Sequence, residues 1–202
     1  MNPYVVTGLA MCLVVLIALV GTGYLAVYFT RRAKADVERL LTPLAESIGG
    51  EADVEEAQVE GKWNGTLVQG RMASAAAGTV RLWQTDLIDA AAGTGWNYVY
   101  SRPNPKKKAT DLDVEIITDS GPIREWLETW SVDDLAPIRP NGTDWVQVEY
   151  SPTAGYVRIA RPMHGRNDIP TPELFAQDLM FAEKIGQENR GLQQSLNVEN
   201  AE

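Results

Sequence analysis

An uninterrupted apolar run dominates the hydrophobic pattern at the start of the chain. Residues 4–29 carry no charged side chain, and the basic and acidic residues begin only after them. At about 1.5 Å of rise per residue, a helix of this length spans roughly 39 Å, which exceeds the ~30 Å hydrocarbon core of a bilayer. The pattern predicts a transmembrane anchor formed by residues 1–30, in contact with a lipid bilayer.

Aromatic and basic side chains flank this run as expected at the two surfaces of a membrane. Tyrosines tend to lie at headgroup level, and arginines and lysines stay on the cytoplasmic side. We therefore expect a bacterial, single-pass inner-membrane protein with its N-terminus outside and its soluble domain in the cytoplasm. The predicted membrane-interface residues are Tyr4, Tyr24, Tyr28, Arg31, Arg32 and Lys34.

A cleaved signal peptide is the competing interpretation of the same run. Signal peptides begin with a basic segment and have a shorter apolar core, whereas no lysine or arginine precedes this core. An uncleaved anchor is therefore favoured. Small residues in the run could let a second membrane helix approach closely, although they are common in membrane helices in any case. The candidate helix-packing residues are Gly8, Ala18, Gly21 and Gly23.

Helical spacing continues after the anchor and predicts a juxtamembrane helix over residues 31–50. One face of this helix is apolar. Pro43 predicts a kink, or a new start capped by Thr42. Gly49 and Gly50 predict the end of the helix. The residues of the apolar face are Val37, Leu40, Leu41, Leu44 and Ile48.

The period of the pattern then changes from that of a helix to that of β-strands. Asn64 and Gly65 separate two alternating segments and predict a tight hairpin. Val80 and Leu82 are expected on one face of their strand, and Arg81 and Trp83 on the other. The predicted strands cover residues 54–63, 66–69, 80–88, 96–100, 112–116, 145–150 and 156–161.

Two further helices are predicted within the soluble domain, which spans residues 51–190. Ser120 precedes Gly121 and Pro122 at the start of one, and Thr171 caps the last helix ahead of Pro172. Residues 191–202 are predicted to be a polar tail that is loose unless a partner holds it. Short connections favour an α+β fold with a mainly antiparallel sheet, helices on one face and about three helices in all.

The negative charge of the chain excludes one class of function. The net charge is −9, and residues 35–202 hold 15 basic and 27 acidic residues, or −12. A domain of this sign is not a general nucleic-acid binder, because neutralising phosphates needs clustered lysine and arginine. The one cysteine, Cys12, lies in the apolar run, so neither an intrachain disulfide nor a cysteine metal site is expected.

No catalytic or cofactor motif emerges from the sequence. The one histidine, His164, precedes a glycine and is interpreted as a turn residue. Phosphate-binding glycine loops and a nucleophile elbow are missing. The acidic side chains are interpreted as a solvated surface, with cation binding as the minor alternative. These acids are Asp111, Asp113, Glu115, Asp133 and Asp134. We expect no enzyme activity, no metal and no cofactor.

The sequence is rich in aromatic residues, for which no catalytic or cofactor role is expected. They either fill the core or anchor a protein interface. The candidate interface residues are Trp96, Tyr98, Trp126, Trp130 and Trp145. We expect a non-catalytic, membrane-anchored accessory or scaffold subunit that docks on and stabilises a larger integral membrane protein complex, for example one of respiratory or photosynthetic type. The alternative is a membrane-tethered cytoplasmic ligand-binding or sensory module with a pocket around Trp96 and Tyr98.

Overall fold

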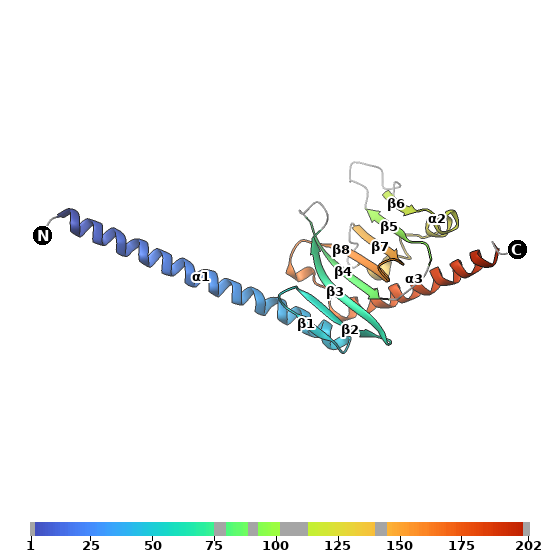
Figure 1. Ribbon diagram of the computed structural model, residues 1–202, viewed down its shortest axis with the longest axis horizontal. Coiled ribbons are helices and arrows are strands. Elements are labelled where there is room, and N and C mark those ends of the chain that lie inside the picture. Colours follow the sequence, from blue (N-terminus) through green and yellow to red (C-terminus); the bar gives the residue numbers. More distant parts are fainter. Residues whose placement is uncertain (1–2, 75–79, 89–92, 102–112, 140–144, 200–202) are drawn as a thin grey trace. The chain divides into compact units, whose positions relative to one another are not determined.

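The chain divides into two units, Met1–Arg39 and Leu40–Glu202. The computed structural model describes residues 3–74, 80–88, 93–101, 113–139 and 145–199. The first unit is the N-terminal part of helix α1 (Pro3–Ser47), as Figure 1 shows. The second unit contains the last turns of α1 and all the remaining elements.

Helix α1 is long and apolar enough to cross a membrane. Its most apolar stretch has a mean hydropathy of 2.3, and none of that stretch is buried in the protein. The core helix of a soluble protein would be mostly covered by other residues. The exposure of α1 instead matches a segment surrounded by the apolar interior of a membrane. A membrane anchor and a signal sequence both fit this finding. It is the one such helix within the part of the chain that the structure describes.

Pro43 does not interrupt α1, which continues to Ser47. The predicted new start capped by Thr42 is therefore wrong. Proline removes one helical hydrogen bond, but Leu41 and Leu44 on either side of it are fully buried and hold both parts on the domain. The helix ends as predicted. Gly49 has φ +57°, and the next amide, that of Gly50, donates to the carbonyl of Ala45, as in a Schellman motif.

The domain is built on one eight-stranded sheet whose neighbouring strands are antiparallel, so the predicted α+β class is confirmed. The strand order is β1-β2-β3-β4-β8-β7-β5-β6. The strands are β1 (Glu51–Asp53), β2 (Gln58–Trp63), β3 (Thr66–Ser74), β4 (Arg81–Ile88), β5 (Trp96–Ser101), β6 (Asp113–Thr118), β7 (Trp145–Ser151) and β8 (Tyr156–Met163). The other helices are α2 (Gly121–Glu128), α3 (Pro172–Glu199) and the short 3-10 helices η1 (Ala136–Ile138) and η3 (Arg166–Asp168).

Two strands differ from the sequence prediction. Residues 54–57 form a turn that separates β1 from β2, and Ala57 in that turn has φ +51°. Strand β3 runs past Gly70 to Ser74 instead of ending at residue 69. A side chain at Gly70 would meet the ring of Trp83 at 2.7 Å, so the glycine makes room for that ring within the strand. The predicted hairpin at Asn64 and Gly65 is confirmed, with φ +48° and +84°.

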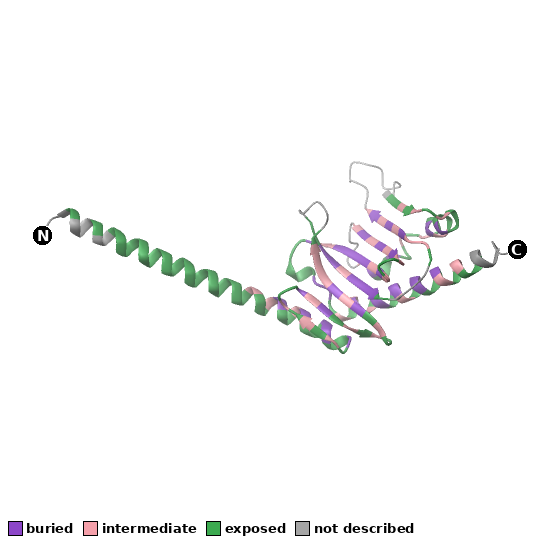
Figure 2. Cartoon of the chain, in the orientation of Figure 1, coloured by how far each residue is buried: buried purple, intermediate pink, exposed green. Residues whose placement is uncertain are grey.

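Helices α2 and α3 and the end of α1 pack on the same face of the sheet. Phe175 of α3 lies against Trp83, and Trp126, just inside the end of α2, lies against Trp96. Ile48, the residue that follows α1, lies over Gly61. Along β5 and β7, buried residues alternate with half-buried ones, as Figure 2 shows. We call the helix-bearing side the covered face and the opposite side the open face.

Polar contacts hold α3 on the covered face. The indole N–H of Trp63 donates to Glu183 over 3.3 Å, and that of Trp96 donates to the buried Asn189 over 3.1 Å. The side-chain amide of Gln193 donates to the carbonyl of Thr94. These contacts fix the C-terminal half of the helix, which continues to Glu199. Residues 191–199 are therefore helical, and the prediction of a loose tail beginning at residue 191 is wrong.

Candidate interaction surface

A row of mainly polar side chains crosses the open face through all eight strands. Each residue is the cross-strand partner of the next, so the row lies perpendicular to the strands. Its sign is predominantly acidic, with four carboxylates and one guanidinium. From β1 to β6 the row consists of Glu51, Glu60, Gln69, Asp86, Arg158, Glu149, Asn97 and Ile117.

The centre of this row is a charged network. Arg158 donates to both carboxylate oxygens of Asp86, over 2.7 and 2.8 Å, and reaches Glu149 at 3.7 Å. Arg71 of β3 approaches Asp86 from the other side at 3.8 Å. Burial acts to lower the pKa of Arg158, but the hydrogen bond to Asp86 and its charge outweigh this and raise it. The Asp86 side chain is only 4% exposed, so the network is held rigidly in place.

The aromatic ring of Tyr156 also contacts this network. Its hydroxyl donates to Glu149 over 3.0 Å, and the guanidinium of Arg158 lies 4.0 Å from the centre of its ring. Burial raises the pKa of the phenol. The hydroxyl is therefore a hydrogen-bond donor at neutral pH, and its position on the open face is determined by Glu149 and Arg158 together.

Amide side chains provide further hydrogen-bonding groups on this face. The side-chain carbonyl of Gln84 accepts a bond from Arg71, and Gln58 and Gln69 both donate to Glu60. The side-chain oxygen of Asn97 is buried and has no hydrogen-bond partner, alone among the buried side-chain nitrogen and oxygen atoms of the described residues. Such a group costs about 1–3 kcal/mol, so a donor supplied to it from outside would be favourable.

Apolar residues lie around the polar row. Leu67 and Ile88 are cross-strand partners on the open face and are 53% and 41% exposed. Ile117, at the β6 end of the row, is 54% exposed. A polar network with exposed aliphatic side chains near it matches the mixed composition of protein interfaces that form between independently folded partners.

The structure separates the aromatic residues that the sequence grouped together. Trp145 lies on the open face, opposite Ser101, and is half-buried. Trp96 and Tyr98 are buried on the covered face, and both contact the half-buried Trp130. Trp126 completes the cluster.

Four of the five candidate interface residues therefore pack against one another within the domain, as expected of aromatics that fill a core. The predicted ligand pocket around Trp96 and Tyr98 is filled by Trp130, which also contacts Phe181 of α3. Alternation places aromatics on one face of a strand but does not reveal which face the helices cover. That information comes from α2 and α3.

The other chemical candidates lie outside this surface or at its edge. Glu115 is on the open side of β6, Asp113 begins that strand, and Asp111 lies outside the described residues. Asp134 accepts bonds from the backbone and side chain of Ser131, and these bonds lower its pKa. Among the described residues, no group of three or more His, Cys, Asp or Glu is placed to hold a metal ion.

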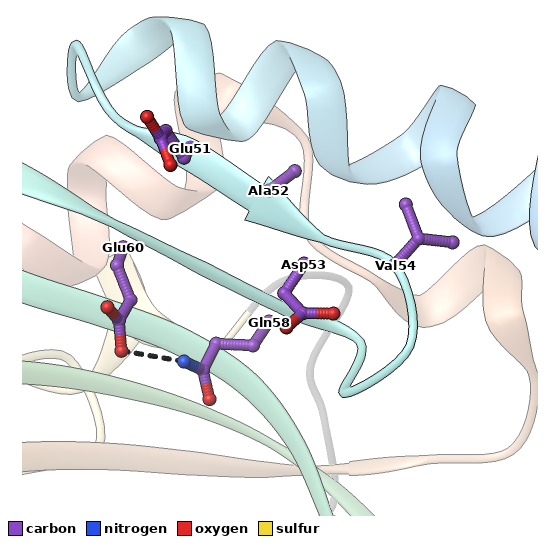
Figure 3. Close-up of a pocket in the computed structure, with 6 residues that line it drawn as sticks. All are labelled: Glu51, Ala52, Asp53, Val54, Gln58 and Glu60. Carbon is purple, nitrogen blue, oxygen red and sulfur yellow. Dashed lines mark hydrogen bonds between the residues drawn. The ribbon is translucent and has the colours of Figure 1, made fainter.

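A pocket of about 380 Å³ lies at the β1 end of the open face (Figure 3). Its polar walls are Glu51, Asp53, Glu60 and Gln58, and the amide of Gln58 donates to Glu60 over 2.6 Å. The pocket extends the acidic row to the edge of the sheet and gives this end of the open face a negative charge.

The predicted membrane residues lie along the exposed part of α1. Tyr4, Tyr24 and Tyr28 are exposed, and Arg32 donates to the hydroxyl of Tyr28. A side chain built at Gly8, Gly21 or Gly23 would meet no other atom within 4 Å, so these positions are open to a neighbouring helix. The carbonyl of Ala18 accepts a bond from Thr22 within the helix. Arg31 and Lys34 follow the apolar stretch.

Comparison with protein-family models finds no match, and comparisons with curated proteins and with solved structures find no significant match either. The function of the chain is therefore argued from its own geometry.

Proposed function

We propose that the chain is a non-catalytic, membrane-anchored accessory or scaffold subunit that docks through its open face on a larger integral membrane protein complex. The observation that carries this proposal is the asymmetry of the sheet. Helices cover one face, and the other presents a rigid charged network with an unpaired buried acceptor, Asn97, near its β6 end.

The chemistry of the network supports binding more than catalysis. Asp86 and Arg158 satisfy each other, and Glu149 accepts from Tyr156. Charged groups that are paired in this way are held in position for recognition. A general base or a nucleophile would need a side chain whose protonation state is poised for a reaction.

The partner surface should be basic. Among the residues whose side chains the structure describes, the strand registers place six carboxylates on the open face against three cations. Opposite charge steers two partners together and selects against wrong ones. The six acids are Glu51, Asp53, Glu60, Asp86, Glu115 and Glu149, and the three cations are Lys62, Arg71 and Arg158.

The membrane helix adds to this docking by tethering. Helix α1 restricts the domain to the membrane plane, which makes binding to a membrane complex effectively intramolecular. We propose that α1 is retained as an anchor, with Arg31, Arg32 and Lys34 on the cytoplasmic side and the domain in the cytoplasm. Gly8, Ala18, Gly21 and Gly23 then offer a surface for helix packing within the same complex.

A single added charge on the open face tests the proposal. Gln147 of β7 is half-buried there, between Ala160 and Val99 on the neighbouring strands. In Gln147→Arg, the new cation faces the basic partner, and we expect at least about a tenfold loss of partner in mild-detergent purification from native membranes. Gln187→Arg, at an exposed position of α3, is the matched control and should keep the partner.

Both variants must keep the thermal unfolding midpoint of the unmodified chain, so that the loss reflects binding. Equal recovery of the partner with Gln147→Arg and Gln187→Arg would contradict docking through the open face. Purification of the unmodified chain without any stoichiometric partner would contradict the accessory role itself.

A further inference from the structure

A second pocket lies away from the acidic row, where β3, β4 and β8 approach η3. Its volume is about 240 Å³, and it is lined by Met72, Arg81, Met163, His164, Gly165 and Arg166. Arg81 is the cross-strand partner of Met163, so the strand pairing fixes one wall of the pocket. The loop from His164 to Arg166 forms the other wall.

The two arginines of this pocket differ from the other arginines of the domain. Arg71 and Arg158 pair with Asp86, and Arg161 pairs with Asp178. Arg124 donates to backbone carbonyls, and Arg139 lies over the ring of Tyr100. Arg190 also has a partner.

Among the described residues, Arg81 and Arg166 alone of the domain's arginines have neither an ion pair nor a hydrogen bond from the side chain. Both line the same pocket. Two unpaired cations close together repel each other, and this occurs in a domain whose overall charge is strongly negative. An anion bound between them would remove that repulsion.

The acid of the neighbouring loop is already used. The Oδ2 of Asp168 accepts hydrogen bonds from the backbone amides of His164, over 2.7 Å, and Gly165, over 2.9 Å. This pairing fixes the loop and leaves the side chains of His164 and Arg166 at the pocket. Asp168 forms no ion pair with Arg81 or Arg166, so both guanidinium groups remain unpaired.

We propose that this pocket binds a phosphate group that carries an organic substituent. Arginine forks match the oxygens of phosphate and bind them in pairs of hydrogen bonds. His164 supplies a further ring N–H. The volume equals that of roughly eight waters, so it exceeds the need of a bare phosphate ion. Met72 and Met163 provide adaptable apolar walls for the substituent.

The same chemistry is offered by a soluble phosphate monoester and by the headgroup of phosphatidic acid. The probe is phenyl phosphate, titrated by calorimetry into the full chain in a zwitterionic detergent at constant ionic strength. We expect saturable binding by the unmodified chain and by Lys184→Gln, at an exposed α3 position, which removes one positive charge as each single arginine variant does. Arg81→Gln/Arg166→Gln should bind at least about tenfold more weakly, because two charge-assisted contacts are lost.

Reconstitution into nanodiscs then identifies the source of the phosphate. Phenyl phosphate binding that is lost in phosphatidic acid nanodiscs but kept in phosphatidylcholine nanodiscs indicates a lipid headgroup, and binding kept in both indicates a soluble ester; either result supports the site. The single variants Arg81→Gln and Arg166→Gln serve if the double variant unfolds. Absence of saturable binding by the unmodified chain would overturn the proposal, as would equal binding by the arginine variants and Lys184→Gln.

Discussion

A fully buried ion pair connects α3 to the sheet on the covered face. Arg161 of β8 donates to both oxygens of Asp178 on α3, over 2.9 and 2.5 Å. Thr85 of β4 donates to the same carboxylate, and the remaining hydrogen-bonding capacity of Arg161 reaches the carbonyl of Ile138 in η1. The pair therefore determines where α3 lies along the sheet, since a shift of the helix would leave a buried charge unpaired.

Removing one partner of this pair should be costly. Arg161→Met leaves Asp178 buried without its counter-charge, and we expect the free energy of unfolding to fall by about 3–5 kcal/mol. The double variant Arg161→Met/Asp178→Leu removes both charges and should recover at least half of that loss. Denaturant unfolding followed by tryptophan fluorescence measures both. A double variant as unstable as the single one would show that the pair contributes more than mutual neutralisation.

The same carboxylate should make stability depend on pH. Burial raises the pKa of Asp178 to about 6 from the ordinary aspartate value of 3.8, against the lowering influence of Arg161 and Thr85. The folded protein then binds more protons than the unfolded chain between these values. This contribution to stability is present at low pH and is lost as pH rises towards 6, by about 3 kcal/mol.

Asp178→Asn provides the comparison for this pH dependence. The difference in free energy of unfolding between the unmodified chain and Asp178→Asn should decrease from about pH 4 to about pH 6 and stay constant above. Unfolding curves at several pH values measure it. A difference that increases with pH would show that Arg161 and Thr85 outweigh burial and lower the pKa.

At the scale of elements, an exposed sheet edge is protected by one side chain. Strand β6 is the last strand of the sheet, and none of the described strands pairs with its outer side. The guanidinium of Arg124 on α2 donates to the carbonyls of Ile116 and Thr118, over 3.3 and 3.5 Å. These carbonyls would otherwise be free to pair with a strand of another molecule.

Arg124→Ala should expose this edge. We expect concentration-dependent self-association of the full chain in detergent, measured by light scattering on a sizing column, with little change in stability because Arg124 is exposed. Arg124→Lys retains the charge that discourages pairing and should stay closer to the unmodified chain. If Arg124→Ala remains as dispersed as the unmodified chain, the guanidinium does not protect the edge.

The sequence predicted the elements that depend on local signals and missed those that depend on distant contacts. Asn64 and Gly65 specified their hairpin, and Thr171 specified the start of α3. The continuation of α1 through Pro43 and of α3 through Asn189 depends on burial against the sheet. The open-face network joins β4 to β8, whose residues Asp86 and Arg158 are 72 positions apart. No local pattern reveals that pairing, so only Trp145 of the predicted interface residues lies on this face.

At the scale of the whole molecule, each unit contributes one interaction surface. The first unit offers an apolar helix without buried residues in its most apolar stretch. The second offers an acidic, rigid open face on a domain whose core is closed by its own helices. A tether and a weak polar surface together can give selective binding that neither provides alone, which is the basis of the proposed accessory role.

Site-specific photo-cross-linking in native membranes tests this role most directly. A benzoylphenylalanine placed at Gln147 reports on the open face, and one at Gln187 reports on the exposed side of α3. We predict that position 147 cross-links to one membrane protein, that the product stays in the membrane after carbonate washing, and that position 187 does not form it. Cross-linking from position 187 alone, or from neither position while the chain remains in the membrane, would contradict docking through the open face.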